Sequence, residues 1–127
     1  MLRFLHTRIR VSDMEASIAF YSRLGFMLTR RMTSPMGNCL AYMGIPGSNH
    51  ELEFCWSSDY TVAVPEDLMH TALSVDDLYA ECERLENSGV EVWPVDWRTR
   101  FVPGLCEGAI AFVTDPDGYE VELIGSH

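Results

Sequence analysis

The sequence predicts an α+β protein built from two tandem β-α-β-β-β modules, and two repeated segments support this prediction. Residues 6–14 (HTRIRVSDM) match residues 70–78 (HTALSVDDL), sharing His, Thr, an aliphatic residue, Val, Asp and a final apolar residue at equal spacing. Near the ends of the two halves, residues 50–54 (HELEF) match residues 119–123 (YEVEL). Internal repeats define an architecture before any single element is assigned. We therefore expect one domain over residues 1–127, with module one at about 1–56, a linker at about 57–67 and module two at about 68–127.

A helix is expected after the first repeated segment of each half, since apolar residues recur there at helical spacing. These residues are Met14, Ile18, Tyr21 and Leu24 in the first half and Leu78, Cys82 and Leu85 in the second.

Short acidic side chains and glycines mark where the two helices begin and end. Asp13 in the first half and Asp76 or Asp77 in the second can cap a helix N-terminus, because their carboxylates accept hydrogen bonds from free backbone N–H groups. Gly25 and Gly89 follow the last apolar residues, and glycine closes a final helical turn at low cost. Each half therefore begins with a strand, a helix ending at glycine, and a second strand.

The rest of each half consists of strands joined by turns. Short or alternating apolar stretches lie at residues 37–43 and 109–113. Turn sequences lie at Pro46-Gly47, Pro103-Gly104 and Asp115-Pro-Asp-Gly118. Each half thus completes a β-α-β-β-β pattern, and the stretch without a clear period at residues 57–67 is expected to link them.

Length and composition indicate a folded, soluble protein. The 127 residues suit one domain, and 47% of them are apolar and 22% charged. No apolar run approaches the roughly 20 residues needed to cross a bilayer. The net charge of −10 opposes binding to nucleic acid or to an anionic membrane, since both need clustered positive charge. We therefore expect no nucleic-acid or membrane partner.

The basic residues and the cysteines exclude further chemistry. All nine basic residues are arginines, so Schiff-base chemistry on lysine is excluded. The four cysteines are far apart with no Cys-x-x-Cys pair, and the chain opens without a charged leader followed by an apolar stretch. We expect reduced thiols and a cytoplasmic location.

Pairs of glutamates occupy the last expected strand of each half. Side chains alternate between the faces of a strand, so Glu51 and Glu53 share one face, as do Glu120 and Glu122. In an arbitrary strand such pairs are usually a solvated surface. Here each half also carries a histidine in its first strand, which makes a metal site the better interpretation.

The histidines at matching positions of the repeat are His6 and His70. Two imidazoles and two carboxylates form a mixed nitrogen and oxygen set that suits zinc, nickel, cobalt or divalent iron. His50 has no histidine counterpart, because Tyr119 occupies the matching place, and His127 ends the sequence. Both are expected to be structural or surface residues.

Several motifs together resemble one known family. They are HTRIRVSD at 6–13, SIAFY at 17–21, LEF at 52–54, HTALSV at 70–75 and DPDGYEVEL at 115–123. In these motifs the chain resembles glyoxalase I, the lactoylglutathione lyase family of the vicinal-oxygen-chelate superfamily, nearly from end to end. The resemblance implies a lyase of methylglyoxal detoxification that acts on a small-molecule substrate. Such an enzyme isomerises the hemithioacetal of methylglyoxal and glutathione to S-lactoylglutathione through an ene-diolate and depends on a metal.

The resemblance also implies roles for individual residues. It places the metal ligands on His6, Glu53, His70 and Glu122, although the family motif can also be laid on Glu51 as the second ligand. Glu53 is preferred because it pairs with Glu122 in the internal repeat. Glu122 takes the role of catalytic base, and Glu53 could serve the opposite face of the same carbon pair.

The expected cofactors are one divalent metal ion, with nickel or cobalt favoured and zinc possible, and glutathione as co-substrate. Arg10 lies where the family has an arginine near glutathione. The family's asparagine after the second ligand and its Lys-Gly loop are both missing, so Arg98 or Arg100 is expected to substitute as an anion-binding group. The family pattern implies a homodimer, and the site could form within one chain or between two.

Alternative functions follow from the same superfamily. An epimerase would use the same carboxylates, although such ligand sets usually contain a glutamine. Extradiol dioxygenases use fewer ligands and longer chains. A binding protein like the bleomycin-resistance proteins would lack the metal ligands, and an interaction domain would leave the matched histidines unexplained.

Overall fold

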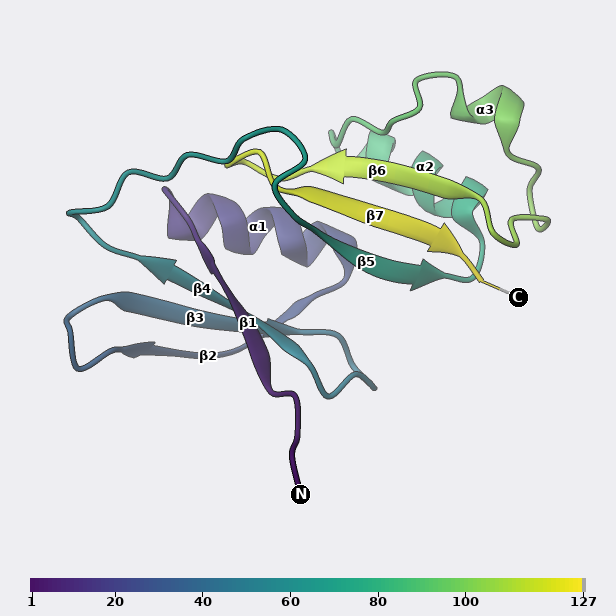
Figure 1. Ribbon diagram of the computed structural model, residues 1–127. Coiled ribbons are helices and arrows are strands. Elements are labelled where there is room, and N and C mark those ends of the chain that lie inside the picture. Colours follow the sequence, from purple (N-terminus) through teal and green to yellow (C-terminus); the bar gives the residue numbers. More distant parts are fainter. Residues whose placement is uncertain (127) are drawn as a thin grey trace. The chain divides into compact units, whose positions relative to one another are not determined.

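The computed structural model describes residues 1–126, so His127 lies outside the described residues. The chain divides into two compact units, Met1–Ala63 and Val64–His127. The division falls inside the segment 57–67 that was expected to act as the linker. Each unit contains one mixed β-sheet (Figure 1).

The first unit is a four-stranded sheet with one helix. Its elements are β1 (His6–Arg10), α1 (Met14–Leu24), β2 (Met27–Thr33), β3 (Cys39–Gly44) and β4 (Glu51–Trp56). The strand order is β1-β4-β3-β2, with β1 parallel to β4 and the other neighbours antiparallel. The first and last strands of the unit are therefore hydrogen-bonded neighbours.

Helix α1 begins and ends at the residues that the sequence predicts. The Asp13 carboxylate accepts a 3.1 Å hydrogen bond from the backbone N–H of Ala16, and Gly25 ends the helix with a φ of 106°. The buried face of α1 packs on the sheet, with the ring of Tyr21 5.1 Å from that of Phe54. Because Phe54 faces the helix, its neighbour Glu53 faces the opposite side of the sheet.

The second unit is a three-stranded sheet with two helices. Its elements are β5 (His70–Val75), α2 (Leu78–Asn87), α3 (Trp97–Arg100), β6 (Ile110–Thr114) and β7 (Glu120–Gly125). The strand order is β5-β7-β6, with β5 parallel to β7. Asp77, one of the two expected caps, accepts a 3.2 Å hydrogen bond from the backbone N–H of Ala80.

The two modules differ after the helix. In the second unit the expected strand is reduced to a single bridge between Trp93 and Phe112. Pro94 follows at once, and a proline has no N–H group to donate to a sheet. The chain turns instead into α3. The α+β class with repeated modules is confirmed, with this shortened strand as the difference.

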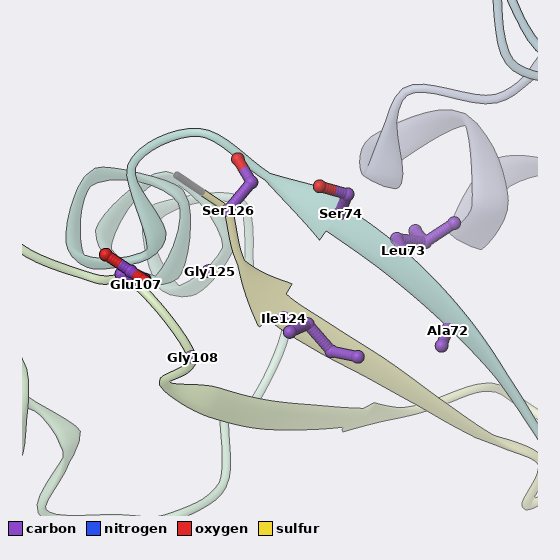
Figure 2. A pocket seen from close by; sticks show the side chains of 8 residues that line it. All are labelled: Ala72, Leu73, Ser74, Glu107, Gly108, Ile124, Gly125 and Ser126. Carbon is purple, nitrogen blue, oxygen red and sulfur yellow. The ribbon is translucent and has the colours of Figure 1, made fainter.

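A cavity of about 510 Å³ borders the second sheet (Figure 2). Its lining is mainly aliphatic side chains and glycines from β5, from the end of β7 and from the loop before β6. Ser74 and Ile124 belong to this lining, and Ile124 follows Glu122 by two residues on the same strand. Among residues 1–126, no helix has the length and apolar character needed to span a membrane.

Candidate metal centre

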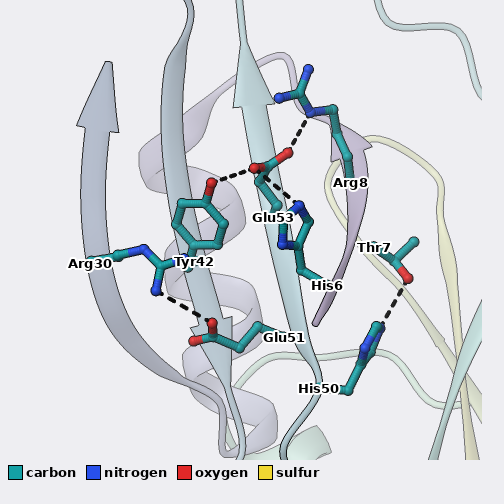
Figure 3. Close-up of polar contacts among 8 residues, drawn as sticks. All are labelled: His6, Thr7, Arg8, Arg30, Tyr42, His50, Glu51 and Glu53. Atoms are coloured by element: carbon teal, nitrogen blue, oxygen red, sulfur yellow. Dashed lines mark hydrogen bonds and ion pairs between the residues drawn. The ribbon is translucent and has the colours of Figure 1, made fainter. Parts of the chain in front are cut away.

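The first imidazole–carboxylate pair joins the outer strand β1 to its neighbour β4. His6 Nε2 lies 3.4 Å from Glu53 Oε2 (Figure 3). Parallel pairing sets this contact, because His6 is opposite Glu51 and Arg8 is opposite Glu53 in the register. Side chains two residues apart share a face, so His6, Arg8 and Glu53 converge on the face opposite α1.

Two further groups hold the Glu53 carboxylate. The Nε–H of Arg8 donates a hydrogen bond to Oε1, and the hydroxyl of Tyr42 donates one to Oε2 (Figure 3). Burial by itself raises the pKa of Glu53, but the hydrogen bonds from Arg8 and Tyr42 and the charges of Arg8 and His6 outweigh it. The pKa of Glu53 therefore lies below its ordinary value, and the carboxylate stays ionised.

Glu51, the alternative second ligand, has different partners. Its Oε2 accepts a 2.5 Å hydrogen bond from the hydroxyl of Thr29, and its Oε1 lies 3.7 Å from Arg30 Nη1. Both partners belong to β2, on the far side of β3 from His6. The structure thus brings His6 together with Glu53 rather than with Glu51 (Figure 3).

The second pair lies at the corresponding place in the second unit. His70 Nε2 is 2.8 Å from Glu122 Oε2. The register again offsets the two residues, with His70 opposite Glu120 and Ala72 opposite Glu122. Phe112 lies edge-on to the His70 ring, with 6.1 Å between the ring centres. The internal repeat in the sequence therefore corresponds to a repeat in side-chain geometry.

The spacing within each pair suits two neighbouring ligands of one metal ion. When ligand bonds are about 2.0–2.2 Å long, neighbouring ligand atoms lie roughly 3 Å apart. The distances of 3.4 Å and 2.8 Å both fall near this value. Across residues 1–126 no group of three or more His, Cys, Asp or Glu side chains gathers at one point. Each pair has donor atoms and a spacing that fit a divalent metal ion.

The three arginines expected to bind an anion have different partners in the structure. Arg10 donates a 2.8 Å hydrogen bond from Nη1 to the hydroxyl of Ser57 and stacks on the ring of Tyr60. Arg98 and Arg100 belong to α3, where each is paired with a carboxylate at 2.7 Å, Glu86 and Asp96 respectively. The structure brings neither of the last two to His70 or Glu122. Their role toward glutathione stays a prediction.

Sequence reasoning missed two residues of this site, Arg8 and Tyr42. Arg8 could have been found, because it lies two residues after His6 on the same strand face. Tyr42 gave no comparable signal, since its place beside Glu53 depends on the pairing of β3 with β4. His50, expected to be a structural or surface residue, lies 3.0 Å from the Thr7 hydroxyl through its Nε2 and stacks on Phe4.

Comparison with known proteins identifies the family of this chain. The chain matches the model of the Glyoxalase/Bleomycin resistance protein/Dioxygenase superfamily over residues 3–123. It is 37% identical to a lactoylglutathione lyase of Salmonella typhimurium, over 97% of this chain and 92% of that protein. It is 38% identical to a probable lactoylglutathione lyase of Vibrio cholerae, over 96% of this chain and 89% of that protein.

Solved structures give the same result for the fold. A trypanothione-dependent glyoxalase I of Leishmania major superposes with a TM-score of 0.72 at 29% identity, covering 98% of this chain and 87% of that one. An antibiotic-binding protein of Streptomyces superposes with a TM-score of 0.74 at 24% identity, covering 100% and 98%. The second likeness concerns the fold alone. With paired modules and matched imidazole–carboxylate pairs, the chain belongs to the Glyoxalase/Bleomycin resistance protein/Dioxygenase superfamily and, within it, to the glyoxalase I-like lyases.

Proposed function

We propose that this enzyme isomerises the hemithioacetal of methylglyoxal and glutathione to S-lactoylglutathione in the cytoplasm. The observation that carries the proposal is the recurrence of one imidazole–carboxylate pair, His6 with Glu53 and His70 with Glu122, at equivalent places in both modules. The similarity to lactoylglutathione lyases over most of the chain supports the choice of substrate.

The four side chains of the two pairs would together hold one divalent ion, with nickel or cobalt favoured and zinc possible. When bound, the ion would act as a Lewis acid that stabilises negative charge on two neighbouring substrate oxygens. Because each module supplies one such pair among residues 1–126, the complete ligand set needs two modules. They belong either to one chain or to two chains of a homodimer.

Glu122 is the residue that we assign to proton transfer. Its carboxylate takes the proton from C1, the carbon that bears sulfur and hydroxyl, and the released electron pair forms a C1–C2 double bond while the C2 carbonyl pair moves onto its oxygen. The carboxylate then returns the proton to C2. The C1 hydroxyl proton passes to the oxygen on C2, so the product is an isomer with a thioester at C1.

Glutathione carries two carboxylates, and this chain has a net charge of −10. Local arginines are therefore needed to bind it. Arg10 is the first candidate, because its present partners, Ser57 and Tyr60, are uncharged. Arg98 or Arg100 would have to exchange its acidic neighbour for a substrate carboxylate, so each is a weaker candidate.

The proposal is tested by removing metal from the purified protein and restoring nickel, cobalt or zinc separately. Thioester formation from methylglyoxal and glutathione is then followed by ultraviolet absorbance. We expect activity only with metal, and its loss in Glu122→Gln but not in Glu120→Gln, which alters a carboxylate on the same strand face. Metal binding without product would reject glutathione as the thiol. Failure to bind metal would reject the proposed site.

A further inference from the structure

The internal repeat breaks at the two residues that hold Glu53. Arg8 follows His6 by two residues on β1, and the matching residue after His70 on β5 is Ala72. Tyr42 is opposite Glu53 across β3 and β4, and the residue opposite Glu122 across β6 and β7 is Phe112. Neither Ala72 nor Phe112 has a side-chain donor. One carboxylate of the repeat therefore has two extra donors that the other lacks.

The carboxylates of Glu53 and Glu122 consequently differ in how many side chains hold them. Glu53 accepts hydrogen bonds at both oxygens, and its side chain is 4% exposed. Glu122 has only His70 as a side-chain partner among the described residues, and its side chain is 14% exposed. Hydrogen bonds from charged donors are among the strong ones, so Arg8 in particular fixes the position of Glu53. Within residues 1–126, Glu122 lacks both of these donors and is held only through His70.

We propose that Arg8 and Tyr42 are positioning residues that lock Glu53 in place, so that Glu122 alone moves protons and the enzyme converts one epimer of its hemithioacetal. This inference rests on the proposed function and narrows its substrate. The carbon that bears sulfur and hydroxyl is a stereocentre, and its two epimers present the reacting C–H bond to opposite sides. A single mobile carboxylate reaches one of them, and the locked one cannot follow the other.

The experiment compares wild type with Arg8→Ala, Tyr42→Phe and the double variant, each of which takes the residue type of the second module. Preformed hemithioacetal is mixed with enough metal-loaded enzyme to outpace the spontaneous interconversion of epimers. Wild type is expected to convert about half of the hemithioacetal in a fast phase and the rest at the spontaneous rate. The double variant is expected to convert nearly all of it in the fast phase. A merely structural role would change rates but not this proportion.

Conversion of both epimers by wild type in one fast phase would overturn the inference and leave the proposed function intact. A fast phase that stays at half in the double variant would also overturn it. Tyr42→Phe removes only a hydroxyl and keeps the ring. It can therefore replace Arg8→Ala in this measurement if Arg8→Ala fails to fold. A fast phase that exceeds half in Tyr42→Phe supports the inference, and one that stays at half counts against it.

A second measurement does not depend on turnover. The Arg8 Nε–H, when bound to Glu53, should exchange with solvent at least about tenfold more slowly than that of exposed Arg3 in proton–nitrogen NMR spectra. The slow exchange should be lost in Glu53→Ala. Equal exchange at Arg8 and Arg3 would overturn the lock. Absence of product from wild type would overturn the proposed function and with it the epimer restriction, while the exchange rate would still decide whether Arg8 holds Glu53.

Discussion

Trp97 Nε1 donates a 2.8 Å hydrogen bond to Glu86 Oε1, which ties the short helix α3 to the end of α2. Trp97 is fully buried, and this carboxylate is the acceptor of its indole N–H. The other oxygen of Glu86 accepts from Arg98 at 2.7 Å, and Arg98 also lies over the Trp97 ring. The Glu86 carboxylate therefore holds α3, which follows the place where the first module has strand β2.

Replacing Glu86 by alanine is expected to destabilise the protein by about 1–3 kcal/mol, the usual cost of a buried donor left without an acceptor. Glu86→Gln should cost less, because an amide oxygen can still accept from Trp97. Chemical denaturation of both variants measures the difference, with exposed Glu91→Gln as the matched control. Equal losses in the alanine and glutamine variants would show that Trp97 does not depend on this bond.

The same contact predicts a pH dependence. Hydrogen bonds from Trp97 and Arg98 lower the pKa of Glu86 below its ordinary value. A carboxylate whose pKa is lower in the folded state stabilises the fold above its unfolded pKa of about 4.3, and this stabilisation is lost as the pH falls through the folded pKa. Denaturation midpoints should therefore fall more steeply below pH ~4.3 in wild type than in Glu86→Gln. Parallel curves would contradict the prediction.

Gly125 at the end of β7 has no room for a side chain. A Cβ placed there would lie 1.8 Å from the carbonyl oxygen of Cys106, and backbone hydrogen bonds hold this loop against the strand. Gly125→Ala must displace the loop, and we expect a loss of about 1–3 kcal/mol in unfolding free energy. Gly44→Ala is the control, because its Cβ would meet a side chain at 3.4 Å. Equal stability of the two variants would argue against the close approach.

The thiols should differ sharply in reactivity. Cys39 is exposed, whereas Cys55, Cys82 and Cys106 are buried. Burial raises the pKa of Cys82 to about 12, so almost none of it is thiolate at neutral pH. A disulfide reagent should label Cys39 quickly and the other three only after unfolding. Rapid labelling of any thiol in the folded Cys39→Ser variant would show that a buried site opens.

Metal should stabilise the fold if the two imidazole–carboxylate pairs bind it. A ligand at one hundred times its dissociation constant adds about 2.7 kcal/mol to a folded state that alone binds it. Nickel or cobalt is therefore expected to raise the Tm of the stripped protein, and the rise should vanish in His6→Ala and in His70→Ala. His50→Ala is the control, because His50 contacts Thr7 and is not one of the proposed ligands. Metal should raise its Tm as much as that of wild type.

The elements that local chemistry specifies could be predicted from sequence. Asp13 and Gly25 bound α1 as expected, because capping and left-handed closure depend on neighbouring residues alone. The sequence left Asp76 and Asp77 as alternative caps of α2, and the structure shows that Asp77 is the cap. The reduction of the second strand of module two to a bridge at Trp93 was not predicted, because the expected strand followed from the repeat, whereas Pro94 has no counterpart in the first module's β2.

The candidate site was predicted through its repeat, not through its contacts. The structure places His6 beside Glu53 and His70 beside Glu122, the pairs that the repeat favours. Tyr42 could not be found this way, because a residue on a neighbouring strand is assigned to Glu53 only by the register of β3 and β4. Ligand roles themselves remain predictions until metal is measured.

The parallel pairing of β1 with β4, and of β5 with β7, has a consequence for biosynthesis. Each imidazole comes at the start of its module and each carboxylate at the end, so a nascent chain cannot form either pair until the whole module has been made. Closing so long a stretch of chain carries an entropic cost that the sheet must offset. A fragment that lacks its last strand would keep a histidine but no partner, so truncated products should be unable to capture metal.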